Sequence, residues 1–237
     1  MPSPPRDRPV SIAFEAVTVS FPGADGPVRV LAETTLVLDE RRVALIGANG
    51  SGKSTLARLV NGLVTATTGR VLVDGLDPDR DGREVRRLVG FAFTDPAAQL
   101  VMPTAVEDVA LSLRRTHPDK DERRRAALEL LDRAGLAGLG DRSVHALSGG
   151  QRQLLALTGV LATNPTILVA DEPTTLLDLA NTRCIADVLF GLDQQLLLVT
   201  HDLELAQRCD RGIVMDLGRV VFDGPAAAAV DHYRTNV

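Results

Sequence analysis

One nine-residue segment constrains the fold of this chain more than any other feature of its sequence. Residues 47–55 read GANGSGKST and fit the pattern G-x-x-x-x-G-K-[ST]. The apolar run Arg42–Ile46 precedes this segment, and apolar residues follow it at helical spacing from Leu56 to Leu63. The order strand, glycine-rich loop, helix opens an α/β unit and predicts a site for a nucleotide phosphate.

This loop offers several kinds of contact to a nucleotide. Its glycines let successive backbone N–H groups curve around a β-phosphate, and the following helix adds its positive end. Lys53, one of only two lysines in the chain, is expected to reach the β- and γ-phosphates, and Ser54 to offer its hydroxyl to Mg²⁺. The nucleotide-binding residues predicted here are Gly47, Asn49, Gly50, Ser51, Gly52, Lys53, Ser54 and Thr55.

A second apolar strand ends in two carboxylates. The run Ile167–Ala170 is followed by Asp171 and Glu172. At the carboxyl edge of a parallel sheet, the first carboxylate is placed to hold the Mg²⁺ shell. The second is placed to polarise a water in line with the γ-phosphate, as a general base. This pattern is a weak signal alone and a strong one beside a phosphate loop.

A second glycine-containing loop lies directly before another helical pattern. Ser148 is a natural N-cap, but the two glycines behind it weaken a helix start unless something approaches the backbone closely. Free N–H groups and a hydroxyl at a helix N-terminus form a second anion site. Because this loop has no lysine, we expect a head-to-tail pair in which it closes on the partner's nucleotide. The residues predicted there are Ser148, Gly149, Gly150 and Gln151.

Composition and charge narrow the class of protein. With 237 residues, 45% apolar and 24% charged, the chain is expected to be globular with one or two domains. The net charge of −5 argues against a nucleic-acid partner. No apolar run approaches the roughly eighteen residues of a membrane helix. The opening MPSPPRDRP predicts a frayed tail and no signal peptide. Cys184 and Cys209 match no metal-ligand spacing and are expected to be reduced and mostly buried.

Hydrophobic periodicity divides the chain into a core and an insertion. Ile12–Phe21 and Val28–Leu38 alternate at period two and predict an antiparallel β piece. Residues 103–145 show helical spacing without a convincing strand, and their run Arg123–Arg125 predicts a solvated helix face. From Thr166 the alternation of strand and helix returns. The middle therefore predicts a helical subdomain inserted into an α/β core.

Together these motifs resemble the ATPase subunit of ATP-binding-cassette (ABC) transporters over nearly the whole chain. The resemblance implies an α/β, ABC-type nucleotide-binding domain with a mostly parallel core sheet, an antiparallel β edge and the inserted helical subdomain. It implies a single domain over residues 1–237, with 10–102 and 162–237 as the core and 103–161 as the helical subdomain. ATP and Mg²⁺ are the implied cofactors, and ATP hydrolysis coupled to transmembrane transport is the implied activity.

The same resemblance implies roles for further residues. Glu172 corresponds to the catalytic base, and His201, after an apolar strand, to the switch histidine that contacts the γ-phosphate. Asp171 corresponds to the metal-binding carboxylate. Asp178 corresponds to the D-loop across the dimer interface. Phe21 lies where the family stacks an aromatic ring on adenine.

One position departs from the family pattern. After the strand Gly90–Phe93 the family usually has a glutamine that senses Mg²⁺ and couples the site to the membrane partner, whereas this chain has Thr94. A hydroxyl can hydrogen-bond a metal-bound water, although its reach is shorter than that of a glutamine amide. Gln99 is expected to line the partner's docking groove and not to replace the missing metal contact.

The segment from Phe93 to Ala110 resembles energy-coupling-factor (ECF) transporters for vitamins and transition metals. Thr94, Leu176–Leu179 and Gly191–Gln195 are most similar to the biotin-system ATPase. The implied partners are a transmembrane coupling subunit, a substrate-binding membrane subunit and a second ATPase subunit, without nucleic acid. The implied location is the cytoplasmic face of the cell membrane, as a peripheral protein.

Other proteins with these motifs stay open at this stage. A cobalt or nickel importer ATPase differs in few motif positions. A DNA-repair ABC protein would insert a long coiled coil between Thr94 and Leu147, where this chain has a compact helical segment. An ABC factor acting on ribosomes would normally carry two cassettes. A subunit with an inactive nucleotide site is argued against by Lys53, Glu172 and His201 together.

Overall fold

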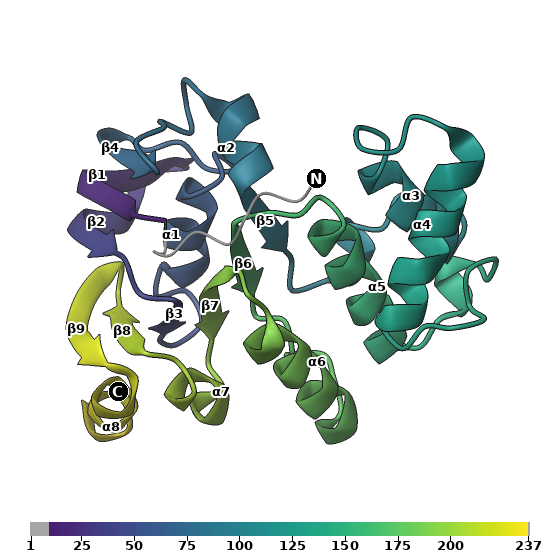
Figure 1. The fold of residues 1–237 in the computed structure, drawn as a ribbon. Helices are drawn as coiled ribbons and strands as arrows, with labels where there is room; N and C mark the ends of the chain where they lie inside the picture. Colours follow the sequence, from purple (N-terminus) through teal and green to yellow (C-terminus); the bar gives the residue numbers. More distant parts are fainter. Residues whose placement is uncertain (1–9, 237) are drawn as a thin grey trace.

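A six-stranded sheet forms the centre of the computed structural model, which describes residues 10–236. The strand order is β5-β6-β7-β3-β8-β9; all neighbours pair in parallel except β8 and β9, which are antiparallel (Figure 1). The inner strands β3, β6 and β7 are buried at every position, as expected for parallel strands covered on both faces. The strands are β3 (Arg42–Ile46), β5 (Val89–Ala92), β6 (Ile167–Asp171), β7 (Gln195–Thr200), β8 (Arg211–Asp216) and β9 (Arg219–Pro225).

The first two strands of the chain do not join this core sheet. β1 (Ile12–Gly23) pairs in antiparallel fashion with β2 (Gly26–Leu38) on one side and with β4 (Thr68–Val73) on the other. The antiparallel β piece predicted from the sequence is therefore a sheet of its own, in the order β2-β1-β4. The antiparallel edge of the core sheet is supplied by β9.

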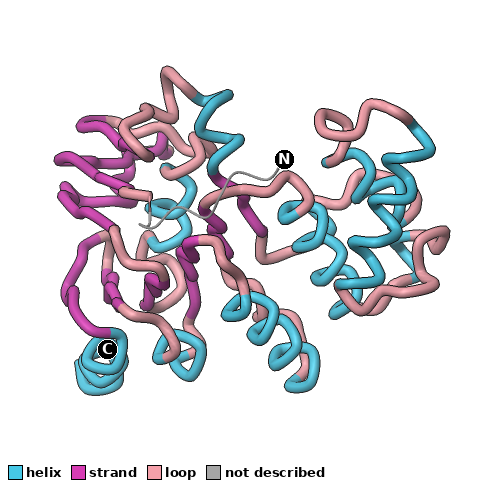
Figure 2. The backbone as a smooth tube through the Cα atoms, in the orientation of Figure 1, coloured by secondary structure: helices cyan, strands magenta, loops and turns pink. Residues whose placement is uncertain are grey.

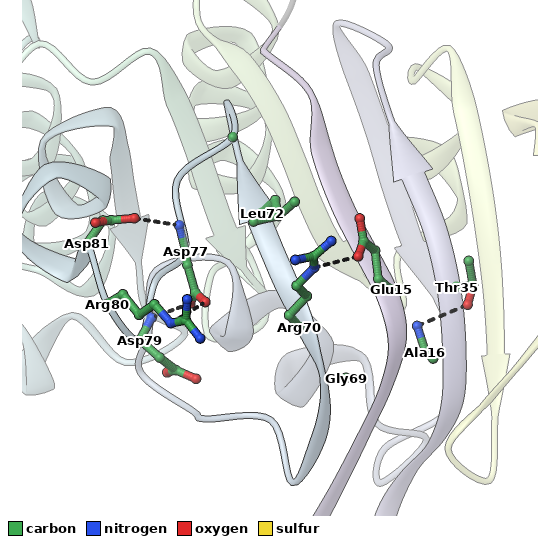
Figure 3. A pocket seen from close by; sticks show the side chains of 11 residues that line it. Glu15, Ala16, Thr35, Gly69, Arg70, Leu72, Asp77, Asp79, Arg80 and Asp81 are labelled. Atoms are coloured by element: carbon green, nitrogen blue, oxygen red, sulfur yellow. Dashed lines mark hydrogen bonds and ion pairs between the residues drawn. The ribbon is translucent and has the colours of Figure 1, made fainter.

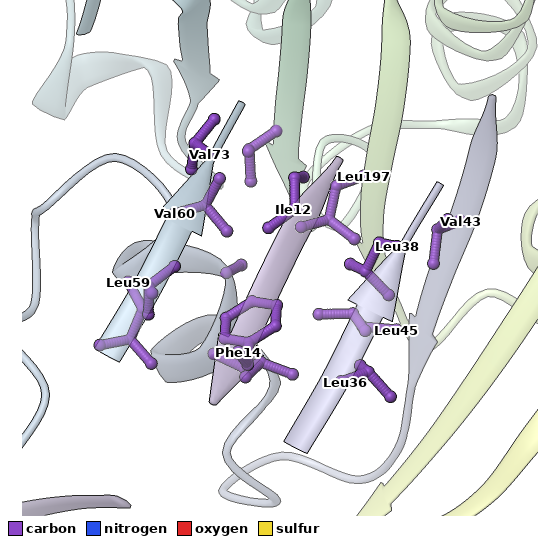
Figure 4. Close-up of a cluster of buried hydrophobic side chains, with 14 of the residues drawn as sticks. Ile12, Phe14, Leu36, Leu38, Val43, Leu45, Leu59, Val60, Val73 and Leu197 are labelled. Carbon is purple, nitrogen blue, oxygen red and sulfur yellow. The ribbon is translucent and has the colours of Figure 1, made fainter. Parts of the chain in front are cut away.

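Alternating side chains of the core strands build two separate apolar layers. Val43 and Leu45 of β3 point into the layer shared with the antiparallel sheet and α1 (Lys53–Leu59), where Phe14 is fully buried (Figure 4). Ala44 and Ile46 point the other way, into a layer that is covered by the helix Gly149–Leu161 and by three later helices. The three later helices are α6 (Leu179–Gly191), α7 (Leu203–Gln207) and α8 (Ala226–Asn236). Burial of each large apolar side chain contributes about 1.5–3 kcal/mol.

The middle of the chain is helical and has an apolar cluster of its own. Val109, Leu131 and Leu155 pack together there, and Figure 1 shows these helices to one side of the core sheet. Arg124 and Arg125 are exposed, and within the described residues the Arg123–Arg125 run contacts nearby groups such as Asp141, which agrees with a solvated face. The boundary of the subdomain at 103–161 stays a prediction. The helices are α3 (Ala105–Ser112), α4 (Lys120–Arg133) and α5 (Gly149–Leu161). α2 (Gly82–Leu88) and the short 3₁₀ helix Pro96–Ala98 precede them in sequence, and the short 3₁₀ helix Val144–Ala146 lies between α4 and α5.

Figure 2 shows the helices as cyan segments of the backbone. Within residues 10–236, none of them is both long and apolar enough to cross a membrane. The predicted frayed tail lies outside the described residues. Cys209 is buried, and burial raises the pKa of its thiol to about 12. Cys184 is exposed on α6, so the expectation of two mostly buried thiols is wrong for this residue. Cys184 lies on the outer face of α6, whereas its sequence neighbours Ile185 and Ala186 face the core.

Candidate functional site

The phosphate loop connects β3 to α1 and is held close to its neighbours. A Cβ atom at Gly47 would lie 2.2 Å from the Met215 carbonyl oxygen, and one at Gly52 would lie 3.0 Å from the Val30 carbonyl oxygen. The Gly218 N–H, in the β8–β9 turn, donates to the Ser51 carbonyl at 3.0 Å. Glycine is therefore required at two points where other backbone segments support the loop from behind. This tight backing is what a preformed phosphate cradle needs.

Lys53 lies inside the curve of the loop. Its Nζ atom donates to the carbonyls of Gly47 at 2.6 Å and Ala48 at 2.9 Å, and the side chain is buried. Burial lowers the pKa of Lys53, while Glu172 and Asp171 oppose that shift. A buried ammonium needs acceptors, and phosphate oxygens would supply charged and therefore stronger ones.

The other predicted residues of the loop lie around this ammonium. Asn49 and Gly50 form its exposed tip, with Gly50 at φ +82°, and Thr55 is half-buried in the first turn of α1. Ser51 is buried, and its hydroxyl has no hydrogen-bond partner within residues 10–236. An unpaired buried hydroxyl in the loop is consistent with a site completed by a ligand.

The residues predicted for Mg²⁺ are in direct contact. The Ser54 hydroxyl donates to Asp171 Oδ1 at 2.7 Å, and Arg58 Nη2 donates to Oδ2 at 3.1 Å. Asp171 is fully buried at the end of β6. One hydroxyl and one carboxylate are hard oxygen ligands that suit Mg²⁺, which usually takes its remaining ligands from phosphates and water. The site therefore fits Mg²⁺, and Arg58 is a contact that the sequence prediction missed.

Glu172 adopts an unusual backbone conformation directly after β6. Its φ of +52° lies in the left-handed region, where residues other than glycine are uncommon. Its Oε2 atom accepts hydrogen bonds from His201 Nδ1 at 2.7 Å and from the Thr175 hydroxyl at 2.9 Å. Its Oε1 atom is buried and has no partner within the described chain. One carboxylate oxygen is thus held in place while the other is left as an acceptor.

Neither Thr175 nor the actual contact of Thr94 was predicted from the sequence. The Thr94 hydroxyl donates to the main-chain carbonyl of Asp171 at 2.8 Å. The Gln99 amide donates to the Ala156 carbonyl at 2.9 Å and accepts from the Phe93 N–H at 3.4 Å. Thr94 had been considered as a contact to a metal-bound water. Gln99 had been expected to line the partner's docking groove, and this stays a prediction. A sequence pattern contains no signal for these side chain to main chain bonds.

The second loop caps α5. The Gln151 N–H donates to the Ser148 hydroxyl at 3.2 Å, and the Ser148 N–H donates to Gln151 Oε1 at 2.9 Å, which forms a capping box. Gly149 is exposed with open space at its Cβ position, whereas a Cβ at Gly150 would meet Asn181 Oδ1 at 2.1 Å. In Figure 1, α5 lies apart from α1, with β5 and β6 between the two helices.

The remaining predicted residues are exposed. Asp178 caps α6 by accepting from the Asn181 N–H at 2.8 Å, and the exposed side chains of Leu176 and Leu179 flank it. Phe21 is 43% exposed on β1. Exposed apolar side chains beside a helix cap are consistent with an interface, and an exposed ring is consistent with stacking.

Two hollows lie outside the phosphate loop. A cavity of about 940 Å³ on the antiparallel sheet is lined by charged groups that pair with one another, such as Arg70 with Glu15 at 2.5 Å (Figure 3). A smaller groove of about 180 Å³ runs between the Thr94–Ala97 segment, the start of α5 and the Pro173–Leu177 loop. The smaller groove is the one that adjoins the predicted site.

Comparison with known proteins decides the family. The sequence profile of the ABC transporter family matches residues 35–175, which include both glycine loops and the Asp171–Glu172 pair. This chain belongs to the ABC transporter ATP-binding family. The fold and the activity predicted from the resemblance are therefore confirmed, and the chain is an ATPase whose ATP hydrolysis is coupled to transport.

Individual relatives cover nearly the whole ABC cassette. The biotin transport ATP-binding protein BioM of Rhizobium etli is 43% identical over 95% of this chain and 98% of that protein. The energy-coupling factor transporter ATP-binding protein EcfA2 of Symbiobacterium thermophilum is 42% identical over 88% of this chain and 76% of that protein. Other relatives at 41–45% identity have only a general ABC transporter description.

A solved dimeric bacterial ABC transporter cassette has the same fold. Its TM-score is 0.81 at 31% identity, and the match covers 91% of this chain and 98% of that chain. The likeness extends over both the core sheet and the helical segment, since so little of either chain is left uncovered.

The close backing of the phosphate loop leads to a test with a matched control. Gly50→Ala should lower the free energy of unfolding by about 1–2 kcal/mol, the cost of a left-handed non-glycine residue, because its Cβ position is open. Gly47→Ala should cost at least about 1–3 kcal/mol more, because the Met215 carbonyl must move. Urea unfolding of both variants measures the difference, and equal costs would contradict the tight backing.

Proposed function

We propose that this chain is the ATP-hydrolysing subunit of an ECF-type importer. The single observation that supports hydrolysis best is the state of the Glu172 carboxylate, with Oε2 held by His201 and Thr175 and with Oε1 buried and unpaired. A general base needs one oxygen in a fixed direction and free to accept a proton. The similarity to BioM and EcfA2 supports the ECF class.

The proposed mechanism assigns one task to each group. The phosphate loop binds the triphosphate through its N–H groups, while Lys53 exchanges its two carbonyl acceptors for phosphate oxygens. Ser54 and Asp171 would hold Mg²⁺, which would supply neutralisation of the charge on the triphosphate. Glu172 Oε1 accepts the proton of the attacking water, and His201 fixes the carboxylate and contacts the γ-phosphate.

We propose that the active form is a head-to-tail dimer. Within one chain α5 lies apart from α1, so the Ser148 loop of one protomer is free to close on the nucleotide held by Lys53 of its partner. The exposed flank of Asp178, with Leu176 and Leu179, would then become buried between protomers. The similarity to dimeric cassettes supports this arrangement.

The proposed partners in the membrane are a transmembrane coupling subunit and a substrate-binding subunit. The groove beside Thr94–Ala97 is the surface offered to the coupling subunit, since it adjoins both the Asp171 strand and the α5 loop. The chain would then act as a peripheral protein at the cytoplasmic face of the membrane. Phe21 is proposed to stack on adenine, because its ring is exposed on β1.

The proposed substrate of the importer is biotin. Two relatives at 40% and 43% identity are biotin transport ATP-binding proteins. The second candidate is a cobalt or nickel importer, which the sequence motifs left open. The solved CbiO1 of Clostridium perfringens, part of the ABC transporter complex CbiONQ, is 30% identical with a TM-score of 0.79 over 94% of this chain and 92% of that chain. The chain is thus also similar to an ATPase of a complex that is not named for biotin.

The role of Glu172 is tested by Glu172→Gln. This change keeps the size and one acceptor oxygen of the side chain but removes its basicity, so ATP binding should persist while turnover falls at least about a hundredfold. Fluorescent-nucleotide titration and phosphate release measure the two properties. Hydrolysis at the wild-type rate would show that Glu172 is not the base.

The substrate is tested by uptake. The chain is reconstituted with a transmembrane coupling subunit and a substrate-binding subunit from the same organism and assayed with labelled biotin, Co²⁺ and Ni²⁺ in parallel. ATP-dependent accumulation of biotin alone is expected. Accumulation of either metal ion without biotin would support the second candidate. The Glu172→Gln variant, which is expected not to hydrolyse ATP, serves as the control for ATP-dependent uptake.

A further inference from the structure

Thr94 forms one hydrogen bond that the proposed mechanism has not used. Its hydroxyl donates to the main-chain carbonyl of Asp171 at 2.8 Å, across 77 residues of sequence. The same peptide unit continues into Glu172, whose N–H donates to the Val199 carbonyl at 2.9 Å. The peptide directly before the proposed base is therefore held on both sides, by a side chain from one direction and by the neighbouring strand from the other.

The sheet register explains why a side chain is needed on one side. Pairing of β6 with β7 continues to Asp171 opposite Val199, whereas pairing with β5 ends at Ala170 opposite Ala92. Beyond Ala92, β5 has no further residue that pairs with β6 and could donate to the Asp171 carbonyl. The hydroxyl of Thr94, two residues beyond the end of β5, supplies the donor on that side.

The next residue is the one with the unusual backbone. Glu172 has φ +52°, a conformation that costs a non-glycine residue on the order of 1–2 kcal/mol and persists only where surrounding contacts impose it. The orientation of the Asp171–Glu172 peptide determines the direction in which the Glu172 side chain leaves the backbone. A contact that fixes this peptide thus fixes the base.

We propose that Thr94 is a positioning residue that orients Glu172 through the Asp171 carbonyl, and that its hydroxyl does not act through the metal. Thr94 contacts the main-chain carbonyl of Asp171, whereas the carboxylate of Asp171 is held by Ser54 and Arg58. The carboxylate oxygens proposed to bind the metal therefore do not depend on Thr94. This inference rests on the proposed role of Glu172 as the base.

The test compares three threonine variants of the full chain. Thr94→Val keeps the shape and removes the hydroxyl, and Thr94→Ser keeps the hydroxyl. Thr116→Val removes an exposed hydroxyl that also donates to a main-chain carbonyl, that of Leu113, in the helical segment. For each variant kcat, KM, the Mg²⁺ concentration at half-maximal rate, and the affinity for a fluorescent ATP analogue with and without Mg²⁺ are measured.

Thr94→Val should lower kcat about tenfold, the effect of one hydrogen bond, and leave KM, analogue affinity and the Mg²⁺ midpoint within about twofold. Thr94→Ser should recover most of the rate, and Thr116→Val should match the wild type. The proposal is overturned by an unchanged kcat in Thr94→Val, by a serine variant as slow as the valine variant, or by a raised Mg²⁺ midpoint, which would assign the hydroxyl to the metal.

Glu172→Gln in the same assay separates this proposal from the proposed function. If Glu172→Gln does not turn over and Thr94→Val hydrolyses ATP normally, the inference about Thr94 fails and the role of Glu172 stands. If Glu172→Gln turns over at the wild-type rate, the proposed base itself is wrong. Thermal melting of each variant identifies a rate loss that comes from unfolding.

Discussion

Parallel pairing of β6, β7 and β3 is the constraint on which the whole site depends. In this pairing Asp171 lies opposite Val199, and Ile46 lies opposite Thr200. The three strands therefore end at one edge of the sheet, and the residues that follow them lie together there. The phosphate loop, Glu172 and His201 come from positions far apart in the sequence, and the shared register brings them into one place.

Burial then determines how the charged groups at this edge are arranged. Lys53 uses two loop carbonyls and Asp171 uses Ser54 and Arg58, because an unpaired charge in such a place would be costly. Glu172 differs, since only one of its two carboxylate oxygens has partners in the described chain. In the proposed mechanism the unpaired oxygen is the one that accepts a proton, and leaving it unpaired at a strained backbone position costs stability.

The strands and the motifs of the site could largely be predicted from the sequence, because short runs of neighbouring residues encode them. The bounds of β3 coincide with the apolar run Arg42–Ile46 expected from the sequence, because a buried parallel strand is a continuous apolar run. The separate sheet of β1, β2 and β4 could not be foreseen, because a period of two shows that a strand is half exposed without showing its partner. The contacts of Arg58 and Thr94 with Asp171 join elements 113 and 77 residues apart, and no local pattern encodes them.

The central claim is that one catalytic site is built from two chains, and mixing two inactive variants tests it most directly. Lys53→Ala breaks the phosphate loop and Ser148→Arg blocks the second loop, so each variant alone should be inactive. In a head-to-tail dimer of the two, one site carries both defects and the other carries neither. Equal mixing should therefore restore about a quarter of the wild-type ATPase rate, because half of the dimers are mixed and each has one intact site. A mixture as inactive as its components would contradict the account.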